Sequence, residues 1–214
     1  MRTKVGIVFD DGFIKSSLKT AELYEEFGIR AVFAVLADPT VNFVPGCGDW
    51  KLWNELQKRG HIIQPHGYTH ANLRNVTHEE GVQLVDRALK SFEDNLEGFK
   101  AKDCIYCFTY NLSTPRLVEY LLPKVRAVRH GGSAFLTDAD LKARVWHSTT
   151  FGPEDPAGDF EKHLDRAKEI EAKALFYVPH GIDGEYWGAM KLESLRRILD
   201  RIVNGEDFEY WPLT

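Results

Sequence analysis

Residues 5–12 read Val5-Gly-Ile-Val-Phe-Asp10-Asp11-Gly12, an apolar run that ends in two carboxylates and a glycine. Such a run is typical of a buried strand that carries charge to one end of a sheet. Burying two adjacent carboxylates is unfavourable unless a cation or hydrogen bonds compensate them. The stretch therefore predicts a core strand with a polar site at its end, although Asp-Asp-Gly by itself is usually an ordinary turn.

A second polar cluster reads His66-Gly-Tyr-Thr-His70 and follows another strand-like run, residues 61–64. Pro65 and Gly67 favour a loop over a helix here. Since both clusters follow strands, they would emerge at the same edge of a parallel sheet. One aspartate and two imidazoles leave coordination positions open, which is the pattern of a catalytic divalent metal, whereas structural zinc usually has four ligands rich in cysteine.

Strand-like and helix-like segments alternate along the whole chain, which predicts an α/β fold with a parallel sheet. Periodicity alone leaves an open doubly wound sheet and a closed barrel as alternatives, and both place ligands at the carboxyl ends of strands. The expected strands are residues 5–9, 31–36, 61–64, 105–108, 125–129, 145–149 and 175–178. The expected helices cover residues 15–27, 50–58, 77–96, 159–172 and 190–203, and a further helix begins at Thr114-Pro115.

Length and composition limit the number of domains and the kinds of partner that the protein can have. The 214 residues are 43% hydrophobic and contain no linker-like stretch, so we expect a single domain over residues 1–214. A net charge of -5, from 27 basic and 32 acidic side chains, argues against nucleic acid as a partner. The sequence shows no long apolar run and no secretory leader, so a location in the cytoplasm without a transmembrane segment is expected.

Three cysteines, Cys47, Cys104 and Cys107, fit a reducing compartment. Cys104 and Cys107 lie three apart in a strand-like run and would point to opposite faces, and no second pair is present to complete a zinc ribbon. We therefore expect Cys104 to be packed in the core.

With these motifs in order, the chain resembles the NodB-homology polysaccharide deacetylases of carbohydrate esterase family 4. The family's first signature, Thr-Phe-Asp-Asp-Gly, stands here as Val8-Phe-Asp10-Asp11-Gly. Its His-(Ser/Thr)-x-x-His loop stands as residues 66–70, with Gly67 in place of the hydroxyl residue, and its C-terminal Leu-x-x-His type motif as Phe176-Tyr-Val-Pro-His180. The resemblance implies an α/β fold, a distorted (β/α) barrel of about seven parallel strands.

The resemblance also implies roles for individual residues. Asp11, His66 and His70 would hold one divalent metal ion, Asp10 would be the general base, and His180 would be the general acid that protonates the leaving amine. Zinc fits this ligand set best, and cobalt, nickel and iron also fit it.

The chain departs from the family at the third signature. Where the family has Arg-Pro-Pro-Tyr-Gly, this sequence has Cys107-Phe-Thr-Tyr110-Asn. Tyr110 is retained and would help to hold the oxyanion or the substrate, but the arginine that orients the catalytic aspartate is missing. The segment that normally braces this arginine is not recognisable between residues 125 and 151. Arg129 or His130, at the end of the next strand, could contact Asp10 instead.

Two kinds of function remain open. The first is a metal-dependent N-deacylase that removes an acetyl or formyl group from an N-acylated amino sugar, in the biosynthesis of surface polysaccharide or lipopolysaccharide; a non-sugar amide is a variant of it. The second is a catalytically impaired descendant that only binds carbohydrate or metal. Retention of Asp10 and His180 favours the enzyme. Aromatic side chains that could stack on a sugar ring are Trp50, Trp53, Tyr68, Trp146 and Trp187.

Overall fold

The computed structural model describes residues 2–40, 46–150 and 154–213. Strands and helices alternate in it, as expected. The strands are β1 (Thr3–Ile7), β2 (Phe9–Asp10), β3 (Val32–Val35), β4 (Ile62–Pro65), β5 (Ile105–Cys107), β6 (Ala127–Gly131), β7 (Phe135–Leu136), β8 (Val145–Ser148), β9 (Ala174–Tyr177) and β10 (Phe208–Tyr210). The helices are α1 (Ile14–Glu26), α2 (Trp50–Lys58), α3 (His78–Asn95), α4 (Pro115–Leu121), α5 (Asp138–Ala143), α6 (Pro156–Glu169) and α7 (Leu192–Val203), with short 3-10 turns at Ala101–Asp103 and Thr109–Asn111.

Hydrogen bonds join the strands into three sheets, with the orders β10-β1-β9-β7, β2-β3-β4 and β5-β6-β8. All of the paired strands are parallel except β7 and β9. The α/β prediction with mostly parallel strands is therefore confirmed. Closure into one barrel is not detected, because no backbone ladder joins β4 to β5 or β8 to β9 among the described residues. Between β4 and β5, the Ile105 N–H donates to Gln64 Oε1 at 2.8 Å.

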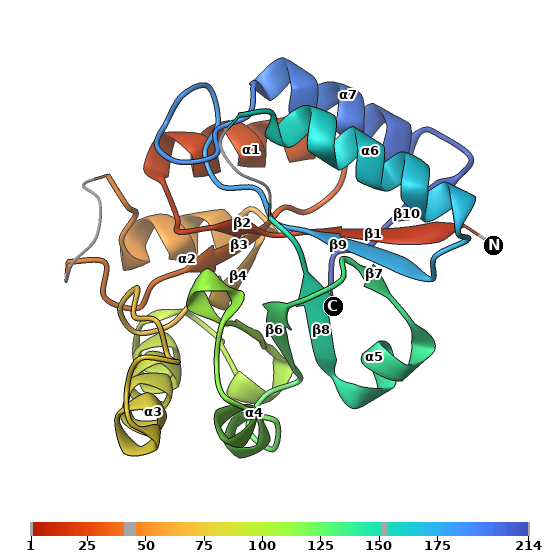
Figure 1. Cartoon of the computed structure of the whole chain (residues 1–214). Coiled ribbons are helices and arrows are strands. Elements are labelled where there is room, and N and C mark those ends of the chain that lie inside the picture. The colour runs from red at the N-terminus through yellow and green to blue at the C-terminus, as the bar shows by residue number, and fades with distance from the viewer. Residues whose placement is uncertain (1, 41–45, 151–153, 214) are drawn as a thin grey trace.

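The strands separate two apolar clusters, because successive side chains of a strand point to opposite faces. In β9, Phe176 belongs to the smaller cluster and Tyr177 to the larger one. Helices cover the strands from outside: α1, α6 and α7 run along one side, and α3 and α4 lie on the other (Figure 1). The smaller cluster also takes in Leu213, for which Gly6 leaves room, since a Cβ atom on Gly6 would lie 2.6 Å from Leu213 Cδ2.

The helix starts follow local capping chemistry. Thr77 Oγ1 accepts a hydrogen bond from the Glu80 N–H, and the Glu80 carboxylate accepts one from the Thr77 N–H, which completes the predicted capping box of α3. Thr114 caps α4 in the same position, with Pro115 at its first turn. The sequence prediction did not include β7, β10 or α5. Helix α5 has its own capping box, Thr137 with Asp140, which was a readable signal.

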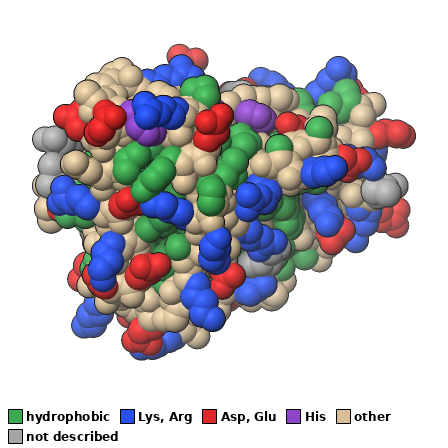
Figure 2. All heavy atoms as spheres, turned by 90° about the horizontal axis from the view of Figure 1, so that it is seen from below, with side chains coloured by type: hydrophobic (Ala, Val, Ile, Leu, Met, Phe, Trp, Pro, Cys, Tyr) green, Lys and Arg blue, Asp and Glu red, His purple; other side chains and the backbone are tan. Residues whose placement is uncertain are grey.

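Charged side chains of both signs are interspersed with small apolar areas on the face seen in Figure 2. None of the helices in the described ranges combines the length and the apolar character that crossing a bilayer requires.

Candidate metal centre and active site

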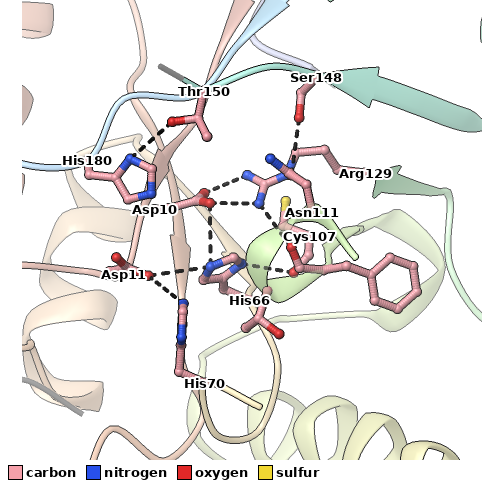
Figure 3. A network of polar contacts seen from close by, with 12 residues as sticks. Asp10, Asp11, His66, His70, Cys107, Asn111, Arg129, Ser148, Thr150 and His180 are labelled. Atoms are coloured by element: carbon pink, nitrogen blue, oxygen red, sulfur yellow. Dashed lines mark hydrogen bonds and ion pairs between the residues drawn. The ribbon is translucent and has the colours of Figure 1, made fainter. Parts of the chain in front are cut away.

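Asp11, His66 and His70 converge at the carboxyl ends of β2 and β4, which both pair with β3. Asp11 Oδ1 lies 3.4 Å from His66 Nε2 and 3.3 Å from His70 Nε2. One ligand atom from each residue lies within 4.8 Å of the others (Figure 3). The two sequence motifs therefore meet in one cluster, as their positions after strands predicted.

The donor set fits a divalent cation. Asp11 Oδ1 is buried and makes no hydrogen bond to any described group, although buried polar atoms are nearly always paired. The His66 Nδ1–H donates to the Cys107 carbonyl at 2.9 Å, so Nε2 is the ring nitrogen that faces the cluster and would bind the ion. Burial favours a raised pKa for Asp11, but His66 and His70 hold that pKa well below its usual range, so the carboxylate is ionised and ready to bind a cation.

The backbone of the two loops that carry the candidate metal ligands is tightly turned. Asp11 and Gly12 both have positive φ angles, 74° and 75°. Gly67 has a φ of 97°, where a side chain is strained, and a Cβ atom there would lie 3.2 Å from the Thr69 carbonyl oxygen. The replacement of the family's hydroxyl residue by Gly67 therefore matches a backbone conformation that only glycine adopts without strain.

Asp10 is held by a buried arginine. Arg129 Nη1 donates to Asp10 Oδ1 at 2.5 Å and Nη2 donates to Oδ2 at 2.7 Å, a two-pronged contact between side chains that are 0% and 4% exposed. Arg129 Nη2 also donates to the Phe108 carbonyl at 3.3 Å. Burial favours a lowered pKa for Arg129, whereas Asp10 raises that pKa above its usual value, so the pair is ionic. The predicted substitute for the family's arginine is thus Arg129.

The strand register explains how this substitution works. Cys107 of β5 and Arg129 of β6 are partners in the parallel ladder, so their side chains leave the same face at the same level. A guanidinium from position 129 can therefore reach the aspartate that one from position 107 would reach. His130, the other candidate, points to the opposite face, where its Nε2 accepts the Ser113 N–H at 3.3 Å.

Cys104 is packed as expected, and Cys107 is packed as well. Cys104 belongs to the larger apolar cluster and Cys107 to the smaller one, on opposite faces of the strand. Burial raises the pKa of the Cys107 thiol to about 12, so it stays protonated and unreactive near neutral pH.

His180 follows β9 and lies beside the two aspartates, on the side away from His70 (Figure 3). Its Nδ1 is 3.5 Å from Thr150 Oγ1, and its ring meets Trp187 edge-on at 4.6 Å between centroids. Burial lowers the pKa of His180, and the carboxylates of Asp10 and Asp11 oppose that shift. The sequence prediction named His180 but not Thr150, for which the sequence offered no signal beyond its place after a strand.

Tyr110 lies on the opposite side of the cluster. Its ring packs edge-on against His70 at 4.4 Å, and its φ of 56° is the left-handed conformation that turns the chain away from β5. All of the residues that the sequence singled out for the site therefore lie around one centre: Asp10, Asp11, His66, His70, Tyr110 and His180.

Comparison with known proteins identifies the family. The sequence model described as polysaccharide deacetylase matches residues 2–119, more than half of the chain. The protein belongs to the polysaccharide deacetylase family. A search of curated proteins gives no match.

Solved structures give the same fold at low identity. The Bc1960 peptidoglycan N-acetylglucosamine deacetylase is 16% identical, with a TM-score of 0.65 over 99% of this chain and 87% of that chain. The peptidoglycan deacetylase PdaC from Bacillus subtilis is 14% identical, with a TM-score of 0.60 over 98% and 88%. BA3943, a CE4 family pseudoenzyme from Bacillus anthracis, is 9% identical, with a TM-score of 0.61 over 98% and 63%.

Family membership and the Asp11, His66 and His70 cluster together define the class of enzyme: a metal-dependent hydrolase of amide bonds.

Proposed function

We propose that this enzyme removes the N-acetyl group from an amino sugar unit of a polysaccharide. The observation that carries the proposal is the buried Asp10–Arg129 pair next to the cluster of metal-binding side chains. A protein that only bound carbohydrate would have no need of a carboxylate fixed at both oxygens beside a metal site. The solved deacetylases of peptidoglycan support the choice of an N-acetylated sugar, since their fold is shared.

In this proposal each residue has a separate task. Asp11, His66 and His70 hold the ion, for which zinc is the best match, and the ion when bound supplies Lewis acidity to the amide carbonyl and to the attacking water. Asp10 takes the proton that the water gives up.

Two further groups complete the site. His180 donates a proton to the amine nitrogen as the carbon–nitrogen bond breaks, because an amine leaves poorly without one. The backbone N–H of Tyr110 stabilises the negative charge on the carbonyl oxygen.

Two finer inferences accompany this proposal. The first is that the three sheets are parts of the distorted barrel implied by the resemblance, which the parallel bridge from Thr149 to Tyr177 supports by linking the end of β8 to β9. The second is that the product serves surface polysaccharide or lipopolysaccharide biosynthesis, in the cytoplasm.

The test measures metal content and acetate release together. Zinc-loaded protein is incubated with tri-N-acetylchitotriose and with a panel of N-acyl amino sugars, and acetate is quantified before and after removal of the metal by a chelator. We expect acetate release that stops on chelation and returns with zinc. Full zinc occupancy without acetate from any member of the panel would instead establish the impaired binding descendant.

A further inference from the structure

Exposed aromatic side chains gather at the candidate site. Within the described ranges, four large apolar side chains are exposed: Tyr110 at 55%, Trp187 at 46%, Tyr186 at 42% and Ile170 at 41%. Tyr110 packs against His70, and Trp187 packs against His180. Three of the four are therefore aromatic residues at or next to the site, and aromatic rings left in water beside a polar centre mark a binding surface.

The loop that carries Tyr186 and Trp187, residues 181–190, is fixed in place by α1. Glu185 Oε2 accepts hydrogen bonds from the Ser16 N–H at 2.5 Å and from Ser16 Oγ at 2.6 Å, and Oε1 accepts the Lys15 N–H at 3.3 Å. Ser16 Oγ in turn accepts the Ile182 N–H at 2.8 Å. Because Phe13, the residue before α1, offers no capping side chain, Glu185 satisfies the free N–H groups of this helix from across the fold.

The same loop adopts an unfavourable backbone conformation. Asp183 and Tyr186 have φ angles of 52° and 58°, where residues other than glycine are uncommon. Lys19 holds Asp183 from α1 with an ion pair of 2.6 Å, and the Tyr186 ring packs on Phe13 with centroids 4.7 Å apart. Strained backbone that is held by surrounding contacts is typical of functional sites, so the position of Trp187 is determined by the fold and does not follow from local preference.

We propose that Trp187 is the stacking surface for the sugar ring that neighbours the N-acylated unit, and that Glu185 positions it. The Trp187 ring contacts His180, so a ring stacked on its exposed face lies next to the unit whose amide reaches the metal-binding side chains. Tyr110, on the His70 side, offers a second aromatic wall. The inference rests on the proposed function and names the residue that recognises the neighbouring sugar unit, a contact that a monosaccharide or a small non-sugar amide cannot make.

The other aromatic candidates from the sequence do not compete for this role. Trp53 and Trp146 are buried in the two apolar clusters, Trp50 packs against Phe92 of α3, and Tyr68 lies under the guanidinium of Arg87. Among the five sequence candidates, Trp187 is therefore the one that combines exposure with contact to a residue of the site.

Binding calorimetry on zinc-loaded Asp10→Asn protein separates recognition from turnover. The probes are tri-N-acetylchitotriose and the monosaccharide N-acetylglucosamine. We expect the trisaccharide to bind at least about tenfold more tightly than the monosaccharide, and Trp187→Ala to remove most of that advantage. Trp187→Phe should retain it to within a few-fold. Ile170→Ala, which also removes an exposed apolar side chain, is the matched control and should leave both dissociation constants unchanged.

A double-mutant cycle tests the part of Glu185. If Glu185 acts by holding Trp187, then Glu185→Ala weakens trisaccharide binding, and the Glu185→Ala/Trp187→Ala protein binds no more weakly than Trp187→Ala alone. If the losses of binding free energy in the two single variants add up in the double variant, then Glu185 does not act by positioning Trp187.

The outcomes also separate this inference from the proposed function. A wild-type protein that deacetylates the trisaccharide, together with Trp187→Ala protein that binds it equally well, overturns the stacking surface and leaves the deacetylase intact. Loss of turnover in Trp187→Ala at unchanged affinity would show that Trp187 only packs His180. Absence of both binding and hydrolysis for every N-acetylated sugar would remove the proposed function and the stacking surface together.

Discussion

The two parts of the chain that build the site differ in how closely they follow the family. Residues 2–119, which the family's sequence model matches, contain Asp11, His66 and His70 in the expected order. The later part supplies Arg129 from the strand next to the one that carries the family's arginine, as well as His180 and its loop. Metal ligands must converge on one ion at fixed distances, so they tolerate little rearrangement. A carboxylate, in contrast, can be oriented by a guanidinium from any neighbouring strand whose register brings it within hydrogen-bond distance.

Removal of a metal ligand is expected to have the largest effect. His66→Ala or His70→Ala should lose the bound ion and with it all measurable hydrolysis, because two ligands do not retain a divalent cation in an open site. Elemental analysis and acetate release are measured on the same samples. His163→Ala, on α6, is the control. Equal metal in wild type and both variants would refute the assignment of the cluster.

The second prediction separates the two aspartates. Asp10→Asn should keep the ion and lower acetate release by about 10²–10⁴-fold, the usual contribution of a general base. Asp86→Asn, a carboxylate that pairs with Lys124 near the surface, serves as the control for the loss of one charge. Hydrolysis at the wild-type rate in Asp10→Asn protein would make Asp10 a structural residue.

The third prediction concerns Arg129, which lies on β6, whereas the family's arginine aligns with Cys107 of β5. Arg129→Ala leaves Asp10 buried without its partner and should lower the free energy of unfolding by about 3–5 kcal/mol, with a loss of hydrolysis. Chemical denaturation measures the first effect. Arg196→Ala is a matched control, because Arg196 makes the same two-pronged contact with Glu26 at the surface, where little stability is expected to be lost.

The register suggests a rescue of this variant. Because Cys107 and Arg129 are ladder partners, adding Cys107→Arg to Arg129→Ala should return a guanidinium to Asp10 and restore part of the hydrolysis. Cys107→Arg alone should destabilise the protein, since it buries a second guanidinium beside the first. If the double variant is no more active than Arg129→Ala, then positions 107 and 129 are not equivalent, and Asp10 cannot be oriented from either strand.

Much of this site could be predicted from the sequence because it depends on local patterns. The expected strands were all found, with ends that shift by one or two residues, and the motifs that follow them meet as parallel topology requires. Arg129 was one of two candidates, and strand alternation would have favoured it, since it lies on the Cys107 face.

What the sequence did not predict depends on contacts between distant residues. Strands β7 and β10 are too short to leave a periodic signal, and they exist because they pair with β9 and β1. Glu185 caps α1 although it lies 169 residues from Ser16 in the sequence, so no local motif predicts this cap. Closure of the barrel depends on pairing of β4 with β5 and of β8 with β9, which hydropathy does not specify. The compartment stays a prediction.

The smallest effect is expected at Gly67, where a substitution tests how rigid the loops that carry the candidate metal ligands are. Gly67→Ala should lower the free energy of unfolding by about 1–3 kcal/mol, because its φ of 97° disfavours a side chain and the new Cβ would press on the Thr69 carbonyl oxygen. Gly28→Ala is the matched control, since Gly28 also has a positive φ, 67°, but has open space around its Cβ position. Thermal or chemical denaturation of both variants isolates the contact from the conformational effect. If Gly67→Ala lowers the free energy of unfolding no more than Gly28→Ala does, then the loop adapts to the new side chain. The rigidity of the metal centre would then come from the ion alone.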